Sequence, residues 1–416
     1  MLRVRIDCFC MQAVRAQFGN YKRLHGWRSP RFQETSPKLA GAMSGSILAI
    51  IVLAAAGDSP APLPSLGVLG LGSNVVDRFY RVCGADGLKP ICGQKGYFAS
   101  EGEVVGGVTL NHLSWAAALG VPTALAALQG EDEAGRMIRA AMDEHGVSCD
   151  ALTVSRDASS SVSHVILDES GERTILMAPH ATATLAAAQV NELFASAVSR
   201  AQLVTTEVSQ VPLSGVTAFL ELARAHKIAS VLDVDVPPSV AAAAAALCAT
   251  PADVLACAKL PTVLKVTRQS AEELLSLAGF ASAPTEASEL AAALQRATGV
   301  PLVAVTAGGD GGALASSSGA CIALMPPEVG TIVDTTGAGD AFLGGLLAAV
   351  WSYSKVHGGA LPEEESALAG CLHAANCAGA ACCEVLGGLP PLGGQGRSRV
   401  ESLLPSSHPG ESPPTV

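Results

Sequence analysis

The sequence is poor in aromatic residues, which make up only 4% of its 416 positions. So few rings favour closely packed helix-on-sheet layers over a surface that stacks on nucleic-acid bases. The formal net charge is −11, and the central part of the chain carries no stripe of Lys and Arg. Binding to phosphate backbones depends on such basic stripes. These features argue against nucleic acid as a partner.

The chain also lacks a long hydrophobic run and any CxxC spacing. One apolar run, Ile47–Ala56, is shorter than the about 20 residues that span a bilayer, so we expect no stable membrane span. We interpret this run as a weak targeting signal. The twelve cysteines show no paired metal-ligand spacing and predict free, mostly buried thiols. Free thiols indicate a reducing compartment, either the cytoplasm or an organelle.

Composition divides the chain into three parts. Residues 1–63 form a basic extension with a Pro-rich linker, and residues 1–42 carry eight Lys or Arg against two acids. This leader is typical of a transit peptide, although a disordered start fits equally well. Residues 64–390 are expected to form the folded body. Residues 391–416 are rich in Gly, Ser and Pro, so we expect a disordered tail.

Within residues 64–390, short apolar runs alternate with helical patterns. This alternation predicts an α/β fold with a mostly parallel central sheet flanked by helices. The alternation is interrupted by successive strand patterns at 152–177 and by the polar stretch 80–105. We expect these two stretches to form a small β-rich lid. Ligands of such folds bind beyond the carboxyl ends of the strands, so the residues there are the candidates for chemistry.

The run DTTGAGD at residues 334–340 is the strongest candidate. It follows a strand-like segment, residues 331–333, and opens an apolar helix of small residues. The N–H groups of Gly337 and Gly339 would lie at a helix N-terminus, which attracts anions such as phosphate. Asp340 would lie close to that anion, where it can accept the proton of an attacking hydroxyl. The alternative is a Gly-rich turn whose acid stabilises the helix dipole.

This run resembles the DTxGAGD signature of the ribokinase/PfkB carbohydrate kinase family. Four further stretches resemble motifs of the family in the same order: Leu69–Ser73 with Asp77, Gly106–Gly107 with Asn111, Gly130–Gly135, and Thr306–Gly311. The resemblance covers about residues 66–390. It implies a ribokinase-like fold and transfer of a phosphoryl group from ATP, with Mg²⁺, to a hydroxyl of a small sugar or sugar derivative.

The resemblance also implies the roles of individual residues. Asp340 would be the catalytic base, and Gly337, Ala338 and Gly339 the anion hole. The other implied residues are Asp77, Gly107, Asn111 and Glu207 for the substrate, Thr306, Gly308, Gly311 and Asn376 for the nucleotide, and Asp334 and Thr336 for a monovalent cation such as K⁺. A solvated loop role stays open for Glu207, and a packing role for Asn376. By the same analogy, a homodimer would form through the lid.

One motif of the family is not present in its usual form. Many relatives carry NxxE after the strand that matches residues 263–266, and here Thr267 and Ser270 replace its Asn and Glu. Glu272 or Glu273 would act from a different helical position. The resemblance therefore implies Mg²⁺ less strongly than it implies the catalytic Asp.

Two other functions stay open. One is a nucleoside kinase on the same fold, which needs an aromatic or large apolar wall for the base; its candidates near the lid are Tyr80, Tyr97 and Phe98. The other is a catalytically silent PfkB-like binding protein, which the altered NxxE favours and the intact Asp340 opposes. Four histidines without ligand spacing are interpreted as structural: His112, His164, His180 and His373.

Overall fold

The computed structural model describes residues 65–82, 98–167 and 173–405, all within the unit Pro62–Val416. The basic leader and its apolar run lie outside the described residues, as does Tyr97. Among the described helices, none is both long enough and apolar enough to cross a bilayer.

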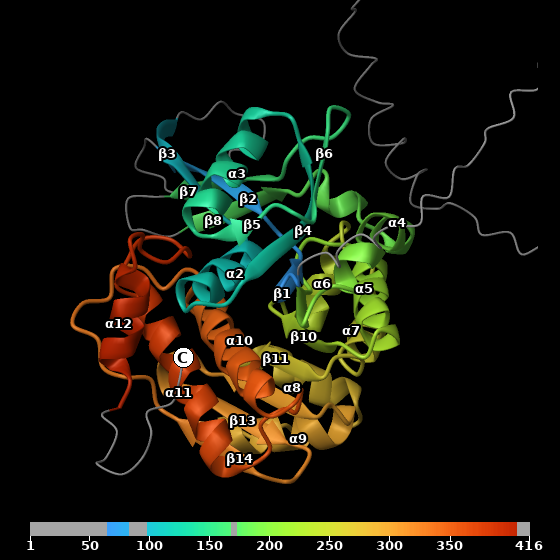
Figure 1. The fold of residues 1–416 in the computed structure, drawn as a ribbon, viewed down its shortest axis with the longest axis vertical. Coiled ribbons are helices and arrows are strands. Elements are labelled where there is room, and N and C mark those ends of the chain that lie inside the picture. Colours follow the sequence, from blue (N-terminus) through green and yellow to red (C-terminus); the bar gives the residue numbers. More distant parts are fainter. Residues whose placement is uncertain (1–64, 83–97, 168–172, 406–416) are drawn as a thin grey trace, which may run out of the picture. The chain divides into compact units, whose positions relative to one another are not determined.

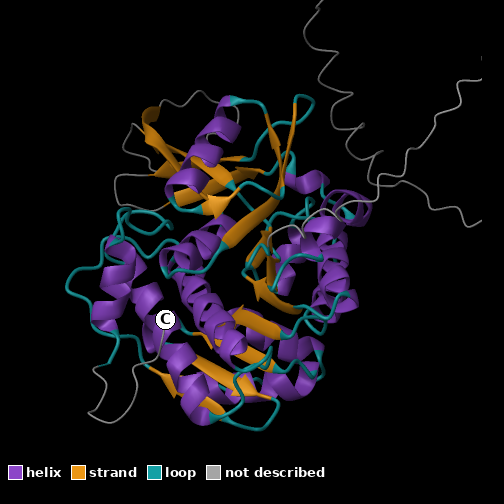
Figure 2. Cartoon of the chain, in the orientation of Figure 1, coloured by secondary structure: helices purple, strands orange, loops and turns teal. Residues whose placement is uncertain are grey.

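A large sheet forms the centre of this unit (Figures 1 and 2). Its strands pair in the order β14 (Cys321–Leu324), β13 (Gly312–Ser316), β12 (Leu302–Thr306), β11 (Val263–Thr267), β10 (Ala229–Val234), β9 (Leu203–Glu207), β1 (Val68–Leu71), β4 (Thr123–Gly130) and β5 (Val147–Ser148), with β6 (Leu152–Ser155) on β4. The pairs from β12 to β5 are parallel, and β13 and β14 add an antiparallel edge. The predicted mostly parallel sheet is confirmed.

Helices cover both faces of this sheet, because its central strands alternate buried side chains between two cores. In β1, Leu69 and Leu71 join one core and Val68 the other. The first core includes residues of α4 (Ala187–Val198), α5 (Leu213–Ala225), α6 (Pro238–Ala243), α7 (Pro251–Cys257), α8 (Arg268–Leu277) and α9 (Ala287–Thr298). The second core includes residues of α2 (Val108–Ala118), α3 (Glu133–Glu144), α10 (Ala338–Val356), α11 (Glu365–Cys382) and α12 (Gln395–Leu403).

The expected lid is a separate four-stranded sheet. Its order is β3 (Phe98–Gly106), β2 (Val75–Val82), β7 (Val162–Leu167) and β8 (Arg173–Ala178). The chain enters this sheet directly from β1 and leaves it into α2 through Gly107. The lid is therefore attached where β1 ends, at the carboxyl edge of the parallel strands.

Two local predictions were wrong. Residues 331–333 form no strand, and Ile332 and Val333 are 64% and 57% exposed, so no burial drives their pairing with the sheet. The tail is not disordered from residue 391, because α12 forms there and buries Val400 in the second core. Its composition concealed this helix, because few of its residues are apolar. Val400 and Leu403 pack against the second core, and Arg399 forms an ion pair with Glu384 (2.6 Å).

Candidate active site

Asp340 lies in the first turn of α10, where the DTTGAGD run enters the helix. Gly337 is the helix N-cap and has a φ of 77°, a left-handed conformation that glycine tolerates. A Cβ at Gly337 would also lie 2.4 Å from the Cα of Gly388. Burial, together with the charge of Asp235, raises the pKa of Asp340 well above its ordinary value. The turn thus presents a buried carboxyl beside the partly exposed backbone of residues 337–339.

Asn111 links α2 to this carboxyl. Its Nδ2 donates to Oδ2 of Asp340 at 2.7 Å, and the side chain is buried. The residue is positioned by Gly107, the N-cap of α2, whose φ is 113°. A Cβ at Gly107 would meet the carbonyl oxygen of Ser73 at 2.7 Å, so the close approach of the two chain segments requires glycine. The structure therefore brings together two predicted site residues from opposite ends of the domain.

Asp77 reaches the same place from the lid. It lies on β2, and its carboxylate accepts a hydrogen bond from the hydroxyl of Ser163 on β7. A Cβ at Gly106 would lie 3.3 Å from Oδ2 of Asp77 and 3.7 Å from Oδ1 of Asn111, so both side chains border Gly106. Burial raises the pKa of Asp77, and the bond from Ser163 offsets part of that effect. Asp77, Asn111 and Asp340 therefore border one region below the lid.

Glu207 is at the end of β9, as expected, but it faces the protein interior. Its side chain is fully buried, and its two oxygens accept hydrogen bonds from the N–H of Ser73 (2.9 Å) and the hydroxyl of Thr109 (2.7 Å). Burial raises its pKa to about 7, against the effect of these bonds. In this arrangement Glu207 joins the end of β1 to α2, which is a structural role.

The predicted nucleotide residues Thr306, Gly308 and Gly311 lie at the carboxyl end of β12, at the turn from β12 to β13. Gly308 and Gly311 have φ of 59° and 85°, and the Ala307 N–H donates to the carbonyl of Gly311, so the turn requires its glycines. Thr306 ends β12. Asn376 on α11 is buried and donates to the carbonyl of Leu324 at 3.0 Å. This contact gives Asn376 a packing role between α11 and β14.

The segment that replaces NxxE begins α8. The Oγ1 of Thr267 caps the helix by accepting from the N–H of Ser270, and Ser270 is fully buried. Glu273 accepts hydrogen bonds from Ser239, while Glu272 is exposed on α8. No carboxylate therefore occupies the position of the usual Glu, and the residues present do not fit the family's Mg²⁺ motif.

Asp334 and Thr336, predicted for a monovalent cation, lie in the turn before α10. The two oxygens of Asp334 accept from the N–H of Thr336 (2.9 Å) and the N–H of Gly387 (3.1 Å). Asp334 thus joins the segment after α11 to the turn that carries the residues predicted for the anion hole.

A buried polar cluster behind Asp340 was missed by the sequence analysis. It consists of His112 on α2, Asp233 on β10 and Lys265 on β11, all fully buried. Lys265 Nζ lies 2.9 Å from Oδ2 of Asp233. The His112 Nε2 lies 3.4 Å from that same oxygen and 3.8 Å from Oδ1 of Asp340. Asp235, just after β10, adds a carboxyl whose pKa is raised to about 6, first by burial and then by Asp233.

One signal in the sequence could have revealed this cluster. Asp233 and Lys265 each interrupt an otherwise apolar strand pattern, and a lone charge in a buried strand needs a partner of opposite sign. The parallel register places the two residues directly opposite each other. His112, Asp233 and Asp340 together also have the composition of a metal site. The Lys265 ammonium already neutralises Asp233, which disfavours a cation there.

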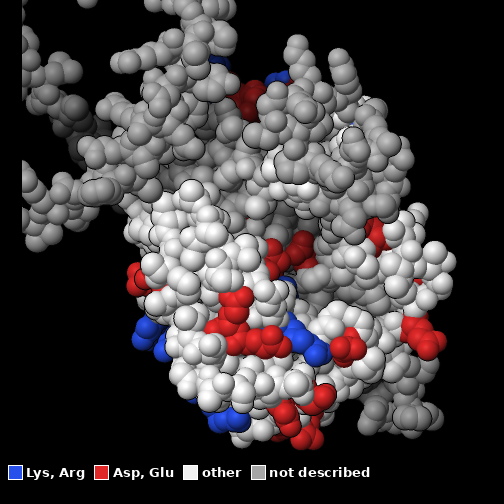
Figure 3. Space-filling model, turned by 180° about the vertical axis from the view of Figure 1, so that it is seen from behind, with Lys and Arg blue, Asp and Glu red and all other residues white. Residues whose placement is uncertain are grey.

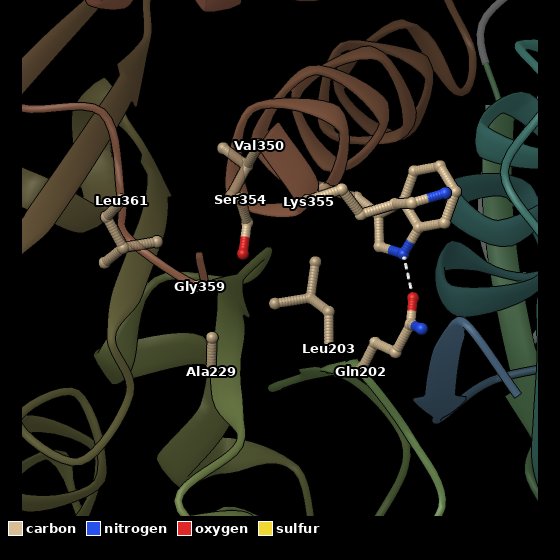
Figure 4. Close-up of a pocket in the computed structure, with 9 residues that line it drawn as sticks. Gln202, Leu203, Ala229, Val350, Ser354, Lys355, Gly359 and Leu361 are labelled. Carbon is tan, nitrogen blue, oxygen red and sulfur yellow. Dashed lines mark hydrogen bonds between the residues drawn. The ribbon is translucent and has the colours of Figure 1, made fainter. Parts of the chain in front are cut away.

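A cavity of about 260 Å³ lies elsewhere, at the C-terminal end of α10 (Figure 4). Leu203 and Ala229, at the starts of β9 and β10, form part of its wall, and Trp351 donates to the side chain of Gln202 at 2.8 Å. These strand starts are at the opposite edge from the candidate active site. None of the predicted site residues lines this cavity.

The visible face of the molecule in Figure 3 carries scattered charges. Among the described residues drawn there, basic side chains lie among acidic ones and form no continuous stripe.

Comparison with known proteins establishes the family. The model of the "pfkB family carbohydrate kinase" matches residues 93–392, and the chain therefore belongs to this family of phosphotransferases. It is 26% identical to mouse ribokinase over 247 residues, which cover 58% of this chain and 69% of the mouse protein. It is also 26% identical to the bifunctional ribokinase/ribose-5-phosphate isomerase A of Fructilactobacillus sanfranciscensis, where the match covers 58% of this chain and 41% of that protein.

Solved structures confirm the ribokinase-like fold. Arabidopsis thaliana ribokinase, solved with ribose and ATP, superimposes with a TM-score of 0.64 at 20% identity and covers 82% of this chain and all of its own. A Burkholderia thailandensis nucleoside kinase, solved with inosine, gives a TM-score of 0.59 at 17% identity, with 81% and 98% covered. Sugar and nucleoside kinases share this fold, so the fold alone does not choose between them.

Proposed function

We propose that the protein transfers the terminal phosphoryl group of ATP to a hydroxyl of a small sugar or sugar derivative. The hydrogen bond between Asn111 and Asp340 carries this proposal, because it joins a substrate-binding side chain to the catalytic base. Asp77 approaches the same region from the lid. An ionised carboxylate can accept bonds from two hydroxyls, which suits a sugar diol.

The reaction follows from these positions. Asp77 and Asn111 orient the acceptor, and Asp340 accepts the proton of its hydroxyl as the oxygen attacks phosphorus. The bond from that oxygen to phosphorus forms while the bond to the leaving ADP breaks. Backbone N–H groups at residues 337–339 stabilise the charge on the transferred group. The β12–β13 turn, with Thr306, would face the nucleotide.

Cations remain predictions. ATP is normally used with Mg²⁺, which would screen the phosphate charge, but the α8 segment offers no carboxylate in the family position. We therefore assign no step to the metal. Asp334 and Thr336 stay candidates for a monovalent ion that would order the turn before α10.

A nucleoside kinase is the second candidate, and Phe79 is the residue that favours it. Side chains alternate along a strand, so Phe79 shares the face of Asp77, whereas Tyr80 points to the other face. Tyr80 stacks on His164 with ring centroids 5.6 Å apart and meets Phe98 at 4.7 Å. Tyr80 and Phe98 therefore lie away from Asp77, and among the described aromatic residues of β2 and β3 only Phe79 shares the face of Asp77.

An acceptor panel tests the proposal. The full-length protein is incubated with ATP and single sugars or nucleosides, and ADP release is compared with a no-acceptor control. The proposal predicts acceptor-dependent turnover with one or more sugars. Turnover with nucleosides alone, lost on Phe79→Ala, would instead establish the second candidate. ATP binding without turnover on any acceptor would support the silent binding protein.

The predicted homodimer would use the outer face of the lid, opposite Asp77. Leu176 and Phe98 are 54% and 60% exposed, and the register places both on that face with Tyr80. Light scattering after gel filtration tests this: wild type should run as a dimer and Leu176→Lys as a monomer. A wild-type monomer at micromolar concentration would contradict it.

A further inference from the structure

His112 is placed between two buried carboxylates. It follows Asn111 on α2, and its ring is fully buried. The Nε2 atom lies 3.4 Å from Oδ2 of Asp233 and 3.8 Å from Oδ1 of Asp340. Within the described residues, neither ring nitrogen has a hydrogen-bond partner of good geometry. An imidazole buried without such a partner needs an explanation.

The chemistry of the neighbours fixes the proton. The ionised Asp233 accepts hydrogen bonds and donates none, so the nitrogen that faces it, Nε2, must carry the hydrogen. Burial lowers the pKa of His112, against the opposing effect of Asp233, which favours a neutral ring. His112 therefore presents a single Nε2–H to the two carboxylates.

Lys265 keeps this arrangement in place. Its ammonium neutralises Asp233 at 2.9 Å, through the same oxygen, Oδ2, that His112 approaches. It also lies close to the anion hole, because a Cβ at Gly339 would be 3.5 Å from its Nζ. Asp233 is thus a fixed anchor, and His112 Nε2 lies between that anchor and the base.

We propose that His112 is a positioning residue for phosphoryl transfer, which presents its Nε2–H to Oδ1 of Asp340 while Asn111 binds Oδ2. This proposal rests on the proposed function, with Asp340 as the base. Together the two donors would fix the plane of the carboxyl group and favour its ionised form. The distance of 3.8 Å between Nε2 and Oδ1, long for a hydrogen bond, would shorten when the acceptor is bound.

The ionisation of Asp340 responds to groups on several elements. Those that face it are His112 on α2, Asp233 and Asp235 at the end of β10, Lys265 on β11, and Cys382 on α11. Loss of the donor at His112 removes a contact that favours the anion, so the pKa of Asp340 should rise further. Catalysis by a base is lost as the pH falls through that pKa.

A pair of variants tests this role by the pH dependence of kcat/KM. His112→Leu removes the donor, whereas His112→Gln retains an N–H near the position of Nε2. We expect His112→Leu to lose roughly 10- to 100-fold in kcat at neutral pH, with the acidic limb displaced to higher pH. His112→Gln should keep the wild-type limb and most of the rate. The exposed His226, replaced by Leu, serves as the control.

A second readout does not depend on activity. The ¹⁵N and ¹H resonances of the His112 side chain, assigned by their loss in His112→Gln, should change in Asp340→Asn. Unchanged resonances would overturn the proposed contact between His112 Nε2–H and Asp340. The proposal would also be overturned if His112→Leu lowered only the melting temperature and left the acidic limb of kcat/KM against pH unchanged. If wild type transfers no phosphate to any acceptor, the proposed function fails. The resonances would still test the contact between His112 and Asp340.

Discussion

Asn111 donates to Asp340 at 2.7 Å, although the two residues lie 229 positions apart in the chain. The bond connects α2, the helix that follows β3 of the lid, to α10, the helix that carries Asp340. In the proposed reaction, Asn111 would therefore contribute to both substrate binding and catalysis.

Asn111→Ala should impair both. It removes a hydroxyl contact and a donor to the Asp340 anion, so kcat/KM should fall roughly 10- to 100-fold. The hydrogen bond from Asn111 lowers the pKa of Asp340, so its loss should raise that pKa. The acidic limb of the profile of kcat/KM against pH should then move to higher pH. Steady-state kinetics from pH 5 to 9 measure both effects. Asn191, exposed on α4, is the matched control, and equal losses in Asn191→Ala would contradict the prediction.

Gly337→Ala should damage the anion hole. The residue combines a φ of 77° with a Cβ position only 2.4 Å from Gly388 Cα, so the turn must shift. We expect a fall in kcat of more than tenfold and a loss of about 1–3 kcal/mol in unfolding free energy. Gly330→Ala is the control, because its Cβ would meet no atom within 4 Å. Wild-type kinetics in Gly337→Ala would show that this turn does not hold the phosphate.

Lys265→Met should destabilise the fold. It leaves Asp233 buried without its partner, which typically costs about 3–5 kcal/mol. The pKa of Asp233 is held below its ordinary 3.8 because Lys265 and His112 outweigh burial. The ionised Asp233 therefore contributes its full share of the unfolding free energy above pH 3.8. This contribution is lost as the pH falls below that value. Urea unfolding at pH 7 and pH 3 should show a smaller deficit for the variant at pH 3.

Two further proteins complete the Lys265 test. Lys259→Met changes an exposed lysine and should unfold like wild type. The double variant Lys265→Met, Asp233→Asn should recover part of the lost stability, because no unpaired charge remains. A double variant as unstable as the sum of its single variants would contradict the ion-pair account.

Glu207 should make stability depend on pH in the opposite direction. Burial raises its pKa from 4.5 to about 7, so the folded state favours the neutral acid. This contribution is complete below 4.5 and is lost as the pH rises through about 7. Asp235 and Asp340 act in the same direction, so the comparison is between variants.

Glu207→Gln isolates the contribution of this residue. The difference in unfolding free energy between wild type and variant should shift by up to about 3 kcal/mol between pH 4.5 and 8. Glu192→Gln, on the exposed face of α4, should follow wild type throughout. A constant difference between wild type and Glu207→Gln would mean that the pKa of Glu207 is the same in the folded and unfolded protein, which would contradict the prediction.

The sequence predicted the sheet, the lid and the motif positions because these depend on local patterns. Apolar runs define buried strands, and Gly337 and Gly107 are required by backbone geometry that leaves a trace in sequence. Relations between distant residues leave weaker traces. Neither the burial of Glu207 beneath Ser73 nor the position of His112 between two carboxylates follows from spacing. The helix α12 was missed because it has few apolar residues, of which Val400 and Leu403 pack against the second core.

Phosphoryl transfer by Asp340→Asn is the most direct test of the central claim. Once the panel has supplied an acceptor, the variant should lose about 100- to 10,000-fold in kcat, because it cannot accept the hydroxyl proton. It should still bind ATP, measured by calorimetry, since the nucleotide residues are unchanged. Asp157→Asn, in an exposed loop, controls for the substitution itself. An Asp340→Asn protein that transfers phosphate at the wild-type rate would contradict the assignment of Asp340 as the base.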